Sequence, residues 1–219
     1  NTYPTGSAPC KAACPAHVPV QAYLRLARDG KYREALAMIK NRKPVPGSMR
    51  QNLQQALESE CTRGKIDDPV SIDAVKKFVA DLDLKADDRY VPEKTVQSVH
   101  GSFDEKIAII GGGPAGLSAA YYLAQMGYKP TVFEKNPIPG GMMTYGIPSY
   151  KLEGVIAAEI DIIKALGAEI KCGVEVGKDV TIDELKKQGY KAFYIAIGCQ
   201  GGKRPGVKND DAKGTAIAV

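Results

Sequence analysis

Ile107-Ala108-Ile109-Ile110-Gly111-Gly112-Gly113-Pro114-Ala115-Gly116 is the stretch that decides the fold of this 219-residue chain. A short apolar run suited to a buried strand ends in glycines that fit the pattern G-x-G-x-x-G. The following residues predict a helix from about Pro114 to Met126, ended by Gly127, and then a strand over 131–134. A strand, a glycine-rich turn and a helix in this order indicate a dinucleotide-binding βαβ unit.

The residues of this unit have separate physical tasks. Gly111 permits the tight turn, Gly113 lets the main chain approach a pyrophosphate, and Gly116 lets the helix pack closely on the strand. The pyrophosphate would lie at the positive end of the helix. Glu134 follows Gly116 by 18 residues and can accept hydrogen bonds from an adenosine ribose. Its negative charge disfavours the 2′-phosphate of NADP at this site.

The rest of the second half alternates helix and strand. We predict a helix over 155–166, an extended segment over 169–172, a capping box at 181–184 that begins a short helix, and a strand over 192–197. Strands that alternate with helices indicate a parallel sheet with helices on both faces. The predicted fold is therefore an α/β doubly wound, Rossmann-like domain.

The first hundred residues have a different composition. They hold four of the 23 glycines, and apolar residues such as Tyr32, Leu36, Ile72 and Phe78 recur there at helical spacing. Gly30 and Ser71 suit a helix end and a helix start, and the polar residues 83–105 are typical of a connecting arm. We therefore expect a helical domain with its arm over 1–100 and an α/β domain over 101–219.

Composition excludes several classes of protein. The net charge is only +5 and the basic residues are scattered, so we expect no nucleic-acid partner. No apolar run is long enough to predict a membrane-spanning segment, and the start, which lacks a Met, shows no secretory signal. Five unevenly placed cysteines do not predict a disulfide framework. These features favour a cytoplasmic protein.

Residues 105–202 resemble the FAD domain of the glutamate synthase small-subunit family. That family includes the NADPH–ferredoxin transhydrogenase large subunit and the N-terminal part of dihydropyrimidine dehydrogenase. The resemblance is carried by IAIIGGGPAGLSAAYYLAQMGY, TVFEKNPIPGGMMTYGIPSYKL and GYKAFYIAIG. It implies FAD rather than NAD, and the turn-rich run 139–148 agrees, because an extended flavin that crosses close to main chain needs backbone freedom there.

The resemblance also implies roles for individual residues. Gly111, Gly113, Ala115 and Gly116 would hold the pyrophosphate and Glu134 the ribose; Gly141 and Met142 would lie near the flavin, with Lys151 nearby, Val176 by the adenine and Gly198 at the closing turn. The candidate cofactor-binding residues also include their neighbours Pro114, Lys135, Gly140 and Gly146. We expect no catalytic residue, because the cofactor performs the chemistry.

The cysteines of the first half suggest iron–sulfur chemistry. Cys10-Lys-Ala-Ala-Cys14-Pro15 resembles the end of a cluster-binding motif, although the spacing alone fits buried packing residues equally well. Residues 8–82 resemble the helical domain of the same family, which carries two [4Fe–4S] clusters. The resemblance implies Cys10, Cys14 and Cys61 as metal ligands.

The sequence departs from the family pattern at other cluster positions. Met49, Leu53 and Leu57 stand where cysteines are expected, as do Thr2 and Thr5 further upstream. Three thiols are fewer than the four ligands of one [4Fe–4S] cluster. Three explanations stay open, namely a domain that has lost its clusters, ligands from a partner chain, or a wrongly assigned stretch of sequence. Residues 50–60 by themselves predict an ordinary amphipathic helix.

Together these features predict an oxidoreductase subunit that passes electrons between NAD(P)H, FAD and [4Fe–4S] clusters to a partner subunit or ferredoxin. The family binds NAD(P)H on a second dinucleotide domain, which nothing after Gly198 resembles, so we expect part of a longer chain with an incomplete FAD domain. The alternatives are a flavin enzyme with its own organic substrate, a non-catalytic FAD-binding scaffold with degenerate clusters, and a plain NAD-binding module.

Cys172 and Cys199 lack the spacing of a redox pair and are expected to be packing residues.

Overall fold

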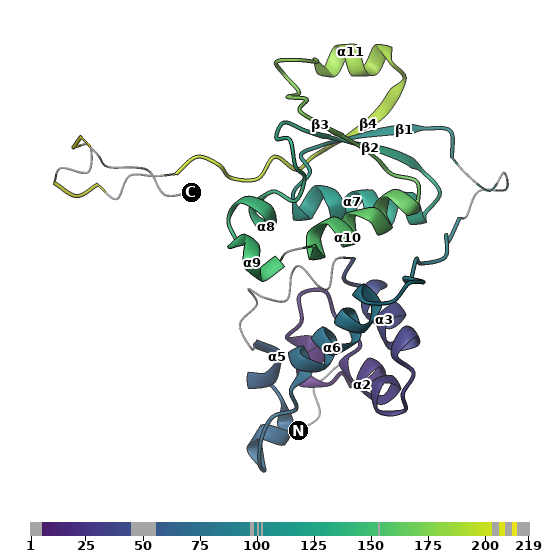
Figure 1. Cartoon of the computed structure of the whole chain (residues 1–219), viewed down its shortest axis with the longest axis vertical. Coiled ribbons are helices and arrows are strands. Elements are labelled where there is room, and N and C mark those ends of the chain that lie inside the picture. The colour runs from purple at the N-terminus through teal and green to yellow at the C-terminus, as the bar shows by residue number, and fades with distance from the viewer. Residues whose placement is uncertain are drawn as a thin grey trace.

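The computed structural model describes residues 6–44, 56–96, 99, 101, 103–152, 154–202, 206–208 and 212–213. Within these residues the chain has a helical part and an α/β part, which lie one against the other (Figure 1). No helix among them is both long and apolar enough to cross a bilayer.

The helical part surrounds an apolar core of its own. Its described helices are α1 (Pro9–Ala12), α2 (Val20–Arg28), α3 (Tyr32–Lys40), α5 (Ala56–Ser59), the 3-10 helix η2 (Thr62–Lys65) and α6 (Ile72–Leu84). The predicted helix end at Gly30 is confirmed, with φ at 75°. Ser71 also precedes α6 as predicted, but its side chain makes no capping hydrogen bond. The core includes Cys10, Tyr23, Leu36, Ile72 and Val79.

Two members of the predicted apolar stripes lie outside this core. Tyr32 and Phe78 are 39% and 49% exposed, and their rings meet edge to face with centroids 5.3 Å apart. They form a surface pair between α3 and α6, because their positions lie at the margin of each apolar face. Of the amphipathic helix predicted over 50–60, residues 50–55 lie outside the described residues, and 56–59 form α5.

The α/β part is a parallel sheet with the strand order β3-β2-β1-β4 in the described chain. Its strands are β1 (Lys106–Ile110), β2 (Lys129–Glu134), β3 (Glu169–Cys172) and β4 (Tyr190–Ile195). Helices α7 (Pro114–Gln125) and α10 (Val155–Ala165) cover the face toward the helical part, and α11 (Ile182–Lys187) covers the other face (Figure 1). The short helices α8 (Met142–Tyr145) and α9 (Ser149–Leu152) follow β2. The predicted α/β fold is confirmed.

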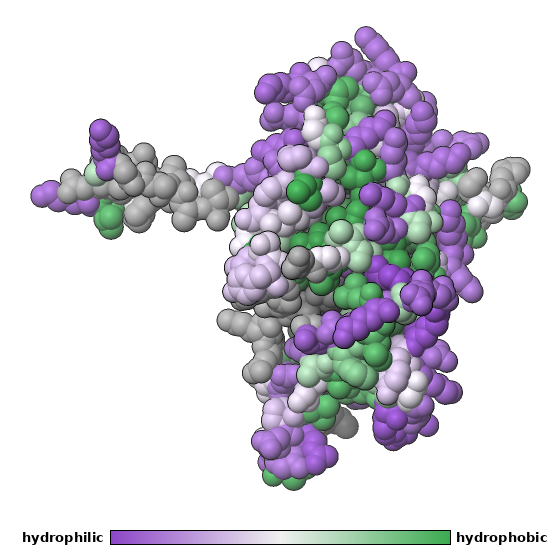
Figure 2. Space-filling view, viewed as in Figure 1, coloured by the Kyte–Doolittle hydropathy of each residue, from purple (hydrophilic) through white to green (hydrophobic). Residues whose placement is uncertain are grey.

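The two faces of the sheet are buried to different extents. Ile109, Leu117 and Ile163 are fully buried between β1, α7 and α10, whereas a smaller cluster around Leu185 and Phe133 lies under α11. In Figure 2 apolar side chains gather over the sheet and its helical layer, and hydrophilic side chains cover α11. At the edge of the sheet, β4 is largely exposed.

The predicted connecting arm is attached along the α/β part. The Thr95 N–H donates to the carbonyl of Gln125 at 2.8 Å, and the ring of Phe103 stacks on that of Tyr128 at 4.2 Å between centroids. These contacts lie at the end of α7 and just beyond it. Thr95 and Phe103, on either side of residues 97–102, therefore both contact the α/β part.

The short helix α11 begins with the predicted capping box. The Glu184 N–H donates to Oγ1 of Thr181 at 3.2 Å, and the Thr181 N–H donates to Oε2 of Glu184 at 2.7 Å. Thr181→Ala removes the first bond, so the free energy of unfolding in a denaturant titration is expected to fall by about 1 kcal/mol. Thr181→Ser keeps the hydroxyl and serves as the control; an equal loss in both variants would contradict this role of the capping box.

Candidate dinucleotide-binding site

A cavity of about 610 Å³ opens at the carboxyl ends of β1, β2 and β4. Ten candidate residues line it: Gly111, Gly113, Pro114, Ala115, Glu134, Lys135, Gly141, Met142, Val176 and Gly198. Parallel sheets bind ligands at this end of their strands, and the volume lies in the range of small-molecule sites. The structure thus brings most of the predicted cofactor-binding residues together.

The three glycines of the fingerprint differ in what surrounds them. A Cβ on Gly116 would collide with the carbonyl oxygen of Gly111, and a Cβ on Gly111, whose φ is 108°, would collide with the carbonyl oxygen of Ala196. A Cβ on Gly113 would meet nothing closer than 3.8 Å. Gly111 and Gly116 are therefore required by packing of the protein, whereas the space beside Gly113 is free for a ligand at the start of α7.

Glu134 is buried, and the backbone fixes its carboxylate. Its Oε2 accepts a hydrogen bond from the Gly112 N–H at 2.7 Å, and its Oε1 accepts one from the Asn136 N–H at 2.9 Å. A carboxylate has about four lone-pair sites, so it keeps acceptor capacity for a ribose in the cavity. The structure shows one task that the sequence did not predict, because Glu134 ties the glycine turn to the end of β2.

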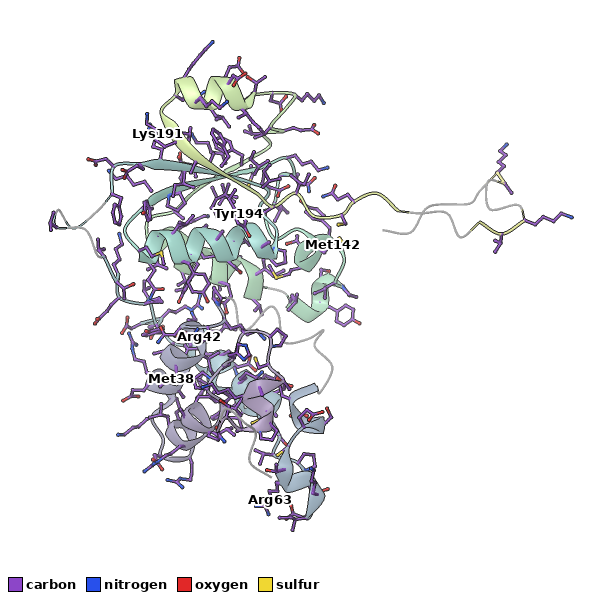
Figure 3. All side chains as sticks on the ribbon, turned by 180° about the vertical axis from the view of Figure 1, so that it is seen from behind. Met38, Arg42, Arg63, Met142, Lys191 and Tyr194 are labelled. Atoms are coloured by element: carbon purple, nitrogen blue, oxygen red, sulfur yellow. The ribbon has the colours of Figure 1, made fainter. Side chains whose placement is uncertain are left out.

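The second glycine turn packs against the first. The Gly140 N–H donates to the carbonyl of Gly112 at 2.7 Å. Gly141, with φ at 55°, lies so close that a Cβ there would be 2.8 Å from the Cα of Gly113. Met142 follows at the rim of the cavity and is 53% exposed (Figure 3). Gly141 therefore has a packing reason in addition to its predicted place near the cofactor, and so has Gly140, whose φ is 124° and whose Cβ would collide with Oγ1 of Thr144.

Four candidate residues do not line the cavity: Gly116, Gly140, Gly146 and Lys151. The first two shape its walls through the packing just described. Gly146 ends α8, and a Cβ there would press on the side chain of Met142. The backbone of Lys151 lies in α9.

Sequence reasoning missed several residues of the cavity. Asn136, Val174, Glu175, Ile197, Cys199 and Gln200 also line it. Gln200 accepts a hydrogen bond from Nζ of Lys135 at 2.7 Å, which joins the segments after β4 and β2. Their place just beyond strand ends was the signal that could have identified them.

The expectation that Cys172 and Cys199 are packing residues is wrong, since both are exposed at such strand ends.

The three candidate metal ligands all lie in the helical part. Cys10 and Cys14 are buried in the core, and Cys61 is partly exposed directly before η2. Burial raises the pKa of Cys10, and the charges of Cys61 and Cys14 raise it further. A hydrogen bond from the backbone of Val70 is the main cause that lowers the pKa of Cys61.

This set does not by itself fit a complete cluster. Leu57, which stands at an expected cysteine position, is buried in the same core as Cys10 and Cys14 and offers no ligand. The other substituted positions, Thr2, Thr5, Met49 and Leu53, lie outside the described residues. Within the described chain, no group of three or more His, Cys, Asp or Glu side chains is arranged to hold a metal ion. The described residues thus include three of the predicted cysteine ligands, which are fewer than the four of one [4Fe–4S] cluster and are not arranged around a common metal position.

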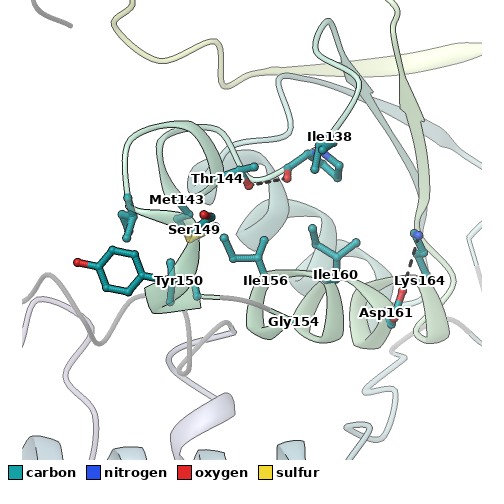
Figure 4. Close-up of a pocket in the computed structure, with 14 residues that line it drawn as sticks. Ile138, Met143, Thr144, Ser149, Tyr150, Gly154, Ile156, Ile160, Asp161 and Lys164 are labelled. Atoms are coloured by element: carbon teal, nitrogen blue, oxygen red, sulfur yellow. Dashed lines mark hydrogen bonds and ion pairs between the residues drawn. The ribbon is translucent and has the colours of Figure 1, made fainter.

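A second cavity of about 490 Å³ lies between α8, α9 and α10 (Figure 4). Its wall is mainly apolar, with Ile138, Met143, Ile156 and Ile160 facing it, and the Asp161–Lys164 ion pair lies at its edge. None of the candidate cofactor residues lines this cavity. The glycine-lined cavity is therefore the candidate cofactor site.

Comparison with known proteins gives matches in both halves of the chain. Residues 4–88 match the family model of dihydropyrimidine dehydrogenase domain II, 4Fe–4S cluster, and residues 109–156 match that of an NAD(P)-binding Rossmann-like domain. The NADP(+)-dependent formate dehydrogenase subunit beta of Moorella thermoacetica is 41% identical over 95% of this chain. The glutamate synthase [NADPH] small chain of Escherichia coli K12 is 32% identical over 98% of it.

The chain is related to the glutamate synthase small-chain family. The predicted resemblance is thereby confirmed, and the chain is homologous to NAD(P)H-dependent oxidoreductase subunits. A further relative, the NAD-dependent dihydropyrimidine dehydrogenase subunit PreT of E. coli K12, is 33% identical over 89% of the chain. The chain spans 32%, 45% and 46% of the lengths of these three relatives.

Among solved structures, a 2-naphthoyl-CoA reductase complex superposes on 57% of this chain. The superposition covers 17% of the reductase chain, with a TM-score of 0.42 and 24% sequence identity.

The different surroundings of Gly113 and Gly116 lead to a paired prediction. Gly116→Ala forces a Cβ into the Gly111 carbonyl and is expected to lower the free energy of unfolding by about 1–3 kcal/mol or more. Gly113→Ala leaves that free energy within about 1 kcal/mol of the parent, but its methyl group enters the space for the pyrophosphate and weakens dinucleotide binding. Chemical denaturation and equilibrium titration with FAD measure the two effects, and similar destabilisation by both variants would contradict the assignment.

Proposed function

We propose that this chain binds FAD in the glycine-lined cavity and belongs to a subunit that passes electrons between NAD(P)H, FAD and [4Fe–4S] clusters to a partner subunit or ferredoxin. The helical domain over 1–100 would carry the thiols, and the domain over 101–219 the flavin. NAD(P)H would bind on a domain that these residues do not include. The five free cysteines are consistent with a cytoplasmic setting.

The observation that carries the flavin proposal is the free space beside Gly113 at the start of α7, with the fixed carboxylate of Glu134 in the same cavity. The first backbone N–H groups of α7 have no partner within the helix and lie at its positive end, which suits a pyrophosphate. Glu134 would accept hydrogen bonds from the ribose, and Val176 would contact the adenine.

The remaining residues would orient the flavin end. Gly141 lies beside Gly113, and Met142 lines the same cavity. Gly198 follows β4, has φ at 69° and lines the same cavity. When bound, FAD takes up two electrons as a hydride and can release them singly. The chain needs only to bind and position it, so no catalytic side chain is assigned.

The cluster part of the proposal rests on the match of residues 4–88 to a 4Fe–4S domain and on Cys10, Cys14 and Cys61, of which the first two share one core. One observation favours a second candidate function. Leu57 is buried with two of these thiols where a fourth ligand is expected. A subunit with degenerate clusters would serve as a non-catalytic, FAD-binding scaffold of a larger redox complex.

Metal and flavin analysis separates the two candidates. Protein purified without oxygen is expected to show a visible flavin spectrum together with iron and acid-labile sulfide. Flavin with iron near zero would favour the scaffold and remove the cluster proposal. A colourless protein that contains NAD would contradict the flavin proposal itself.

Removal of the Glu134 carboxylate tests the proposed ribose contact. Glu134→Ala is expected to weaken FAD binding by an amount on the order of 2–4 kcal/mol, because charge-assisted hydrogen bonds to the ribose are lost. The measurement is the FAD content after dialysis together with the dissociation constant. Glu175→Ala removes an exposed carboxylate from the same cavity and is the matched control, from which we expect a much smaller effect. FAD retention equal to that of the parent in Glu134→Ala would mean that the ribose is held elsewhere.

A further inference from the structure

The junction between the helical and α/β parts contains a buried charge. Lys40, the last residue of α3, is 1% exposed. Its Nζ lies 3.8 Å from Oε2 of Glu159 on α10 and 3.9 Å from Oδ2 of Asp83 on α6. Glu159 is itself 2% exposed. A cation of the helical part is therefore enclosed between a carboxylate of its own part and one of the α/β part.

The arm contributes a second cation to this cluster. The guanidinium of Arg89 pairs with Asp83 at 3.2 Å and donates a hydrogen bond to the carbonyl of Ala158 at 2.5 Å. The Tyr90 N–H donates to the other carboxylate oxygen of Asp83 at 2.7 Å. Asp83 is thus bound by the arm, and Lys40 faces Glu159 across the junction.

Other contacts place this cluster against the helix that begins at the glycine turn. The hydroxyl of Tyr121 on α7 donates to the carbonyl of Lys40 at 3.3 Å, and both residues are fully buried. Arg42, which lies at the junction in Figure 3, acts electrostatically on Tyr122 of the same helix. One helix therefore forms an edge of the nucleotide cavity at its start and contacts the helical part further along.

A buried ion pair adds little net stability, because both charges lose water when the parts meet. It does penalise other arrangements strongly, since a shift that places either charge opposite an apolar surface leaves it uncompensated. Burial lowers the pKa of Lys40, whereas Glu159 and then Asp83 act to raise it, so the charged form depends on both carboxylates. The cluster is therefore suited to select one register between the two parts.

We infer that Lys40 and Glu159 are positioning residues that hold the helical part in one register on α7 and α10. They thereby fix the separation between the thiols and the nucleotide cavity. The inference rests on the proposed function, in which electrons pass between these two sites and their separation governs the rate. Its physical content, a fixed docking of the two parts, can be measured without any redox assay.

Hydrogen exchange followed by mass spectrometry tests this positioning in the full chain. Lys40→Met and Glu159→Met each remove the ion pair between the two parts and leave its other charged side chain buried, and amide exchange across residues 89–96 is expected to rise at least about tenfold. The double variant removes both charges and is expected to return to within about threefold of the parent. It also remains informative if a single variant fails to fold.

Lys76→Met is the matched control. Lys76 is also buried, but it pairs with Asp73 at 2.5 Å within α6, away from the junction. It is expected to leave exchange across 89–96 unchanged. Parent-like exchange in Lys40→Met, or a double variant that exchanges as fast as the single variants, would overturn the inference. A lack of flavin or iron in the parent protein would instead count against the proposed function, so the two failures are distinguishable.

Discussion

The contact between the main chains of Gly111 and Gly116 is the constraint on which the α/β part depends. Because Gly116 carries no Cβ, α7 can start directly against Gly111 at the end of β1. This approach sets the direction of α7, exposes its first N–H groups to the cavity, and leaves free space beside Gly113. The same helix then reaches the helical part through Tyr121. This close backbone contact thus lies at the start of a helix that both borders the glycine-lined cavity and contacts the helical part.

Much of this could be predicted from the sequence, because the decisive features are local. The glycine fingerprint, the apolar strand before it and Glu134 after it lie within one βαβ unit, and the structure has that unit as expected. Hydrophobic periodicity and capping residues likewise predict the helices on either side of Gly30 and the start of α11. Residues that contact one another within a short stretch of chain leave a readable pattern.

The remaining features depend on contacts between distant segments, which leave no such pattern. Gln200 reaches the cavity because β4 lies next to β1 in the sheet, and Lys40 is buried because α10 places Glu159 against it. The exposure of Cys172 and Cys199 likewise follows from their places at strand ends, not from their residue type. At the thiols the sequence already indicated a shortage of ligands, and the burial of Leu57 beside Cys10 and Cys14 gives that shortage a location in the fold.

The central claim is that the cavity at the start of α7 binds FAD and not simply a nicotinamide dinucleotide. The most direct measurement is equilibrium binding of FAD, NAD⁺ and NADP⁺ to the flavin-free chain, by calorimetry or by quenching of flavin fluorescence. The account predicts that FAD binds at least about 100-fold more tightly than either nicotinamide dinucleotide, a difference of about 2.7 kcal/mol. Binding of NAD⁺ as tight as that of FAD, or tighter, would contradict it.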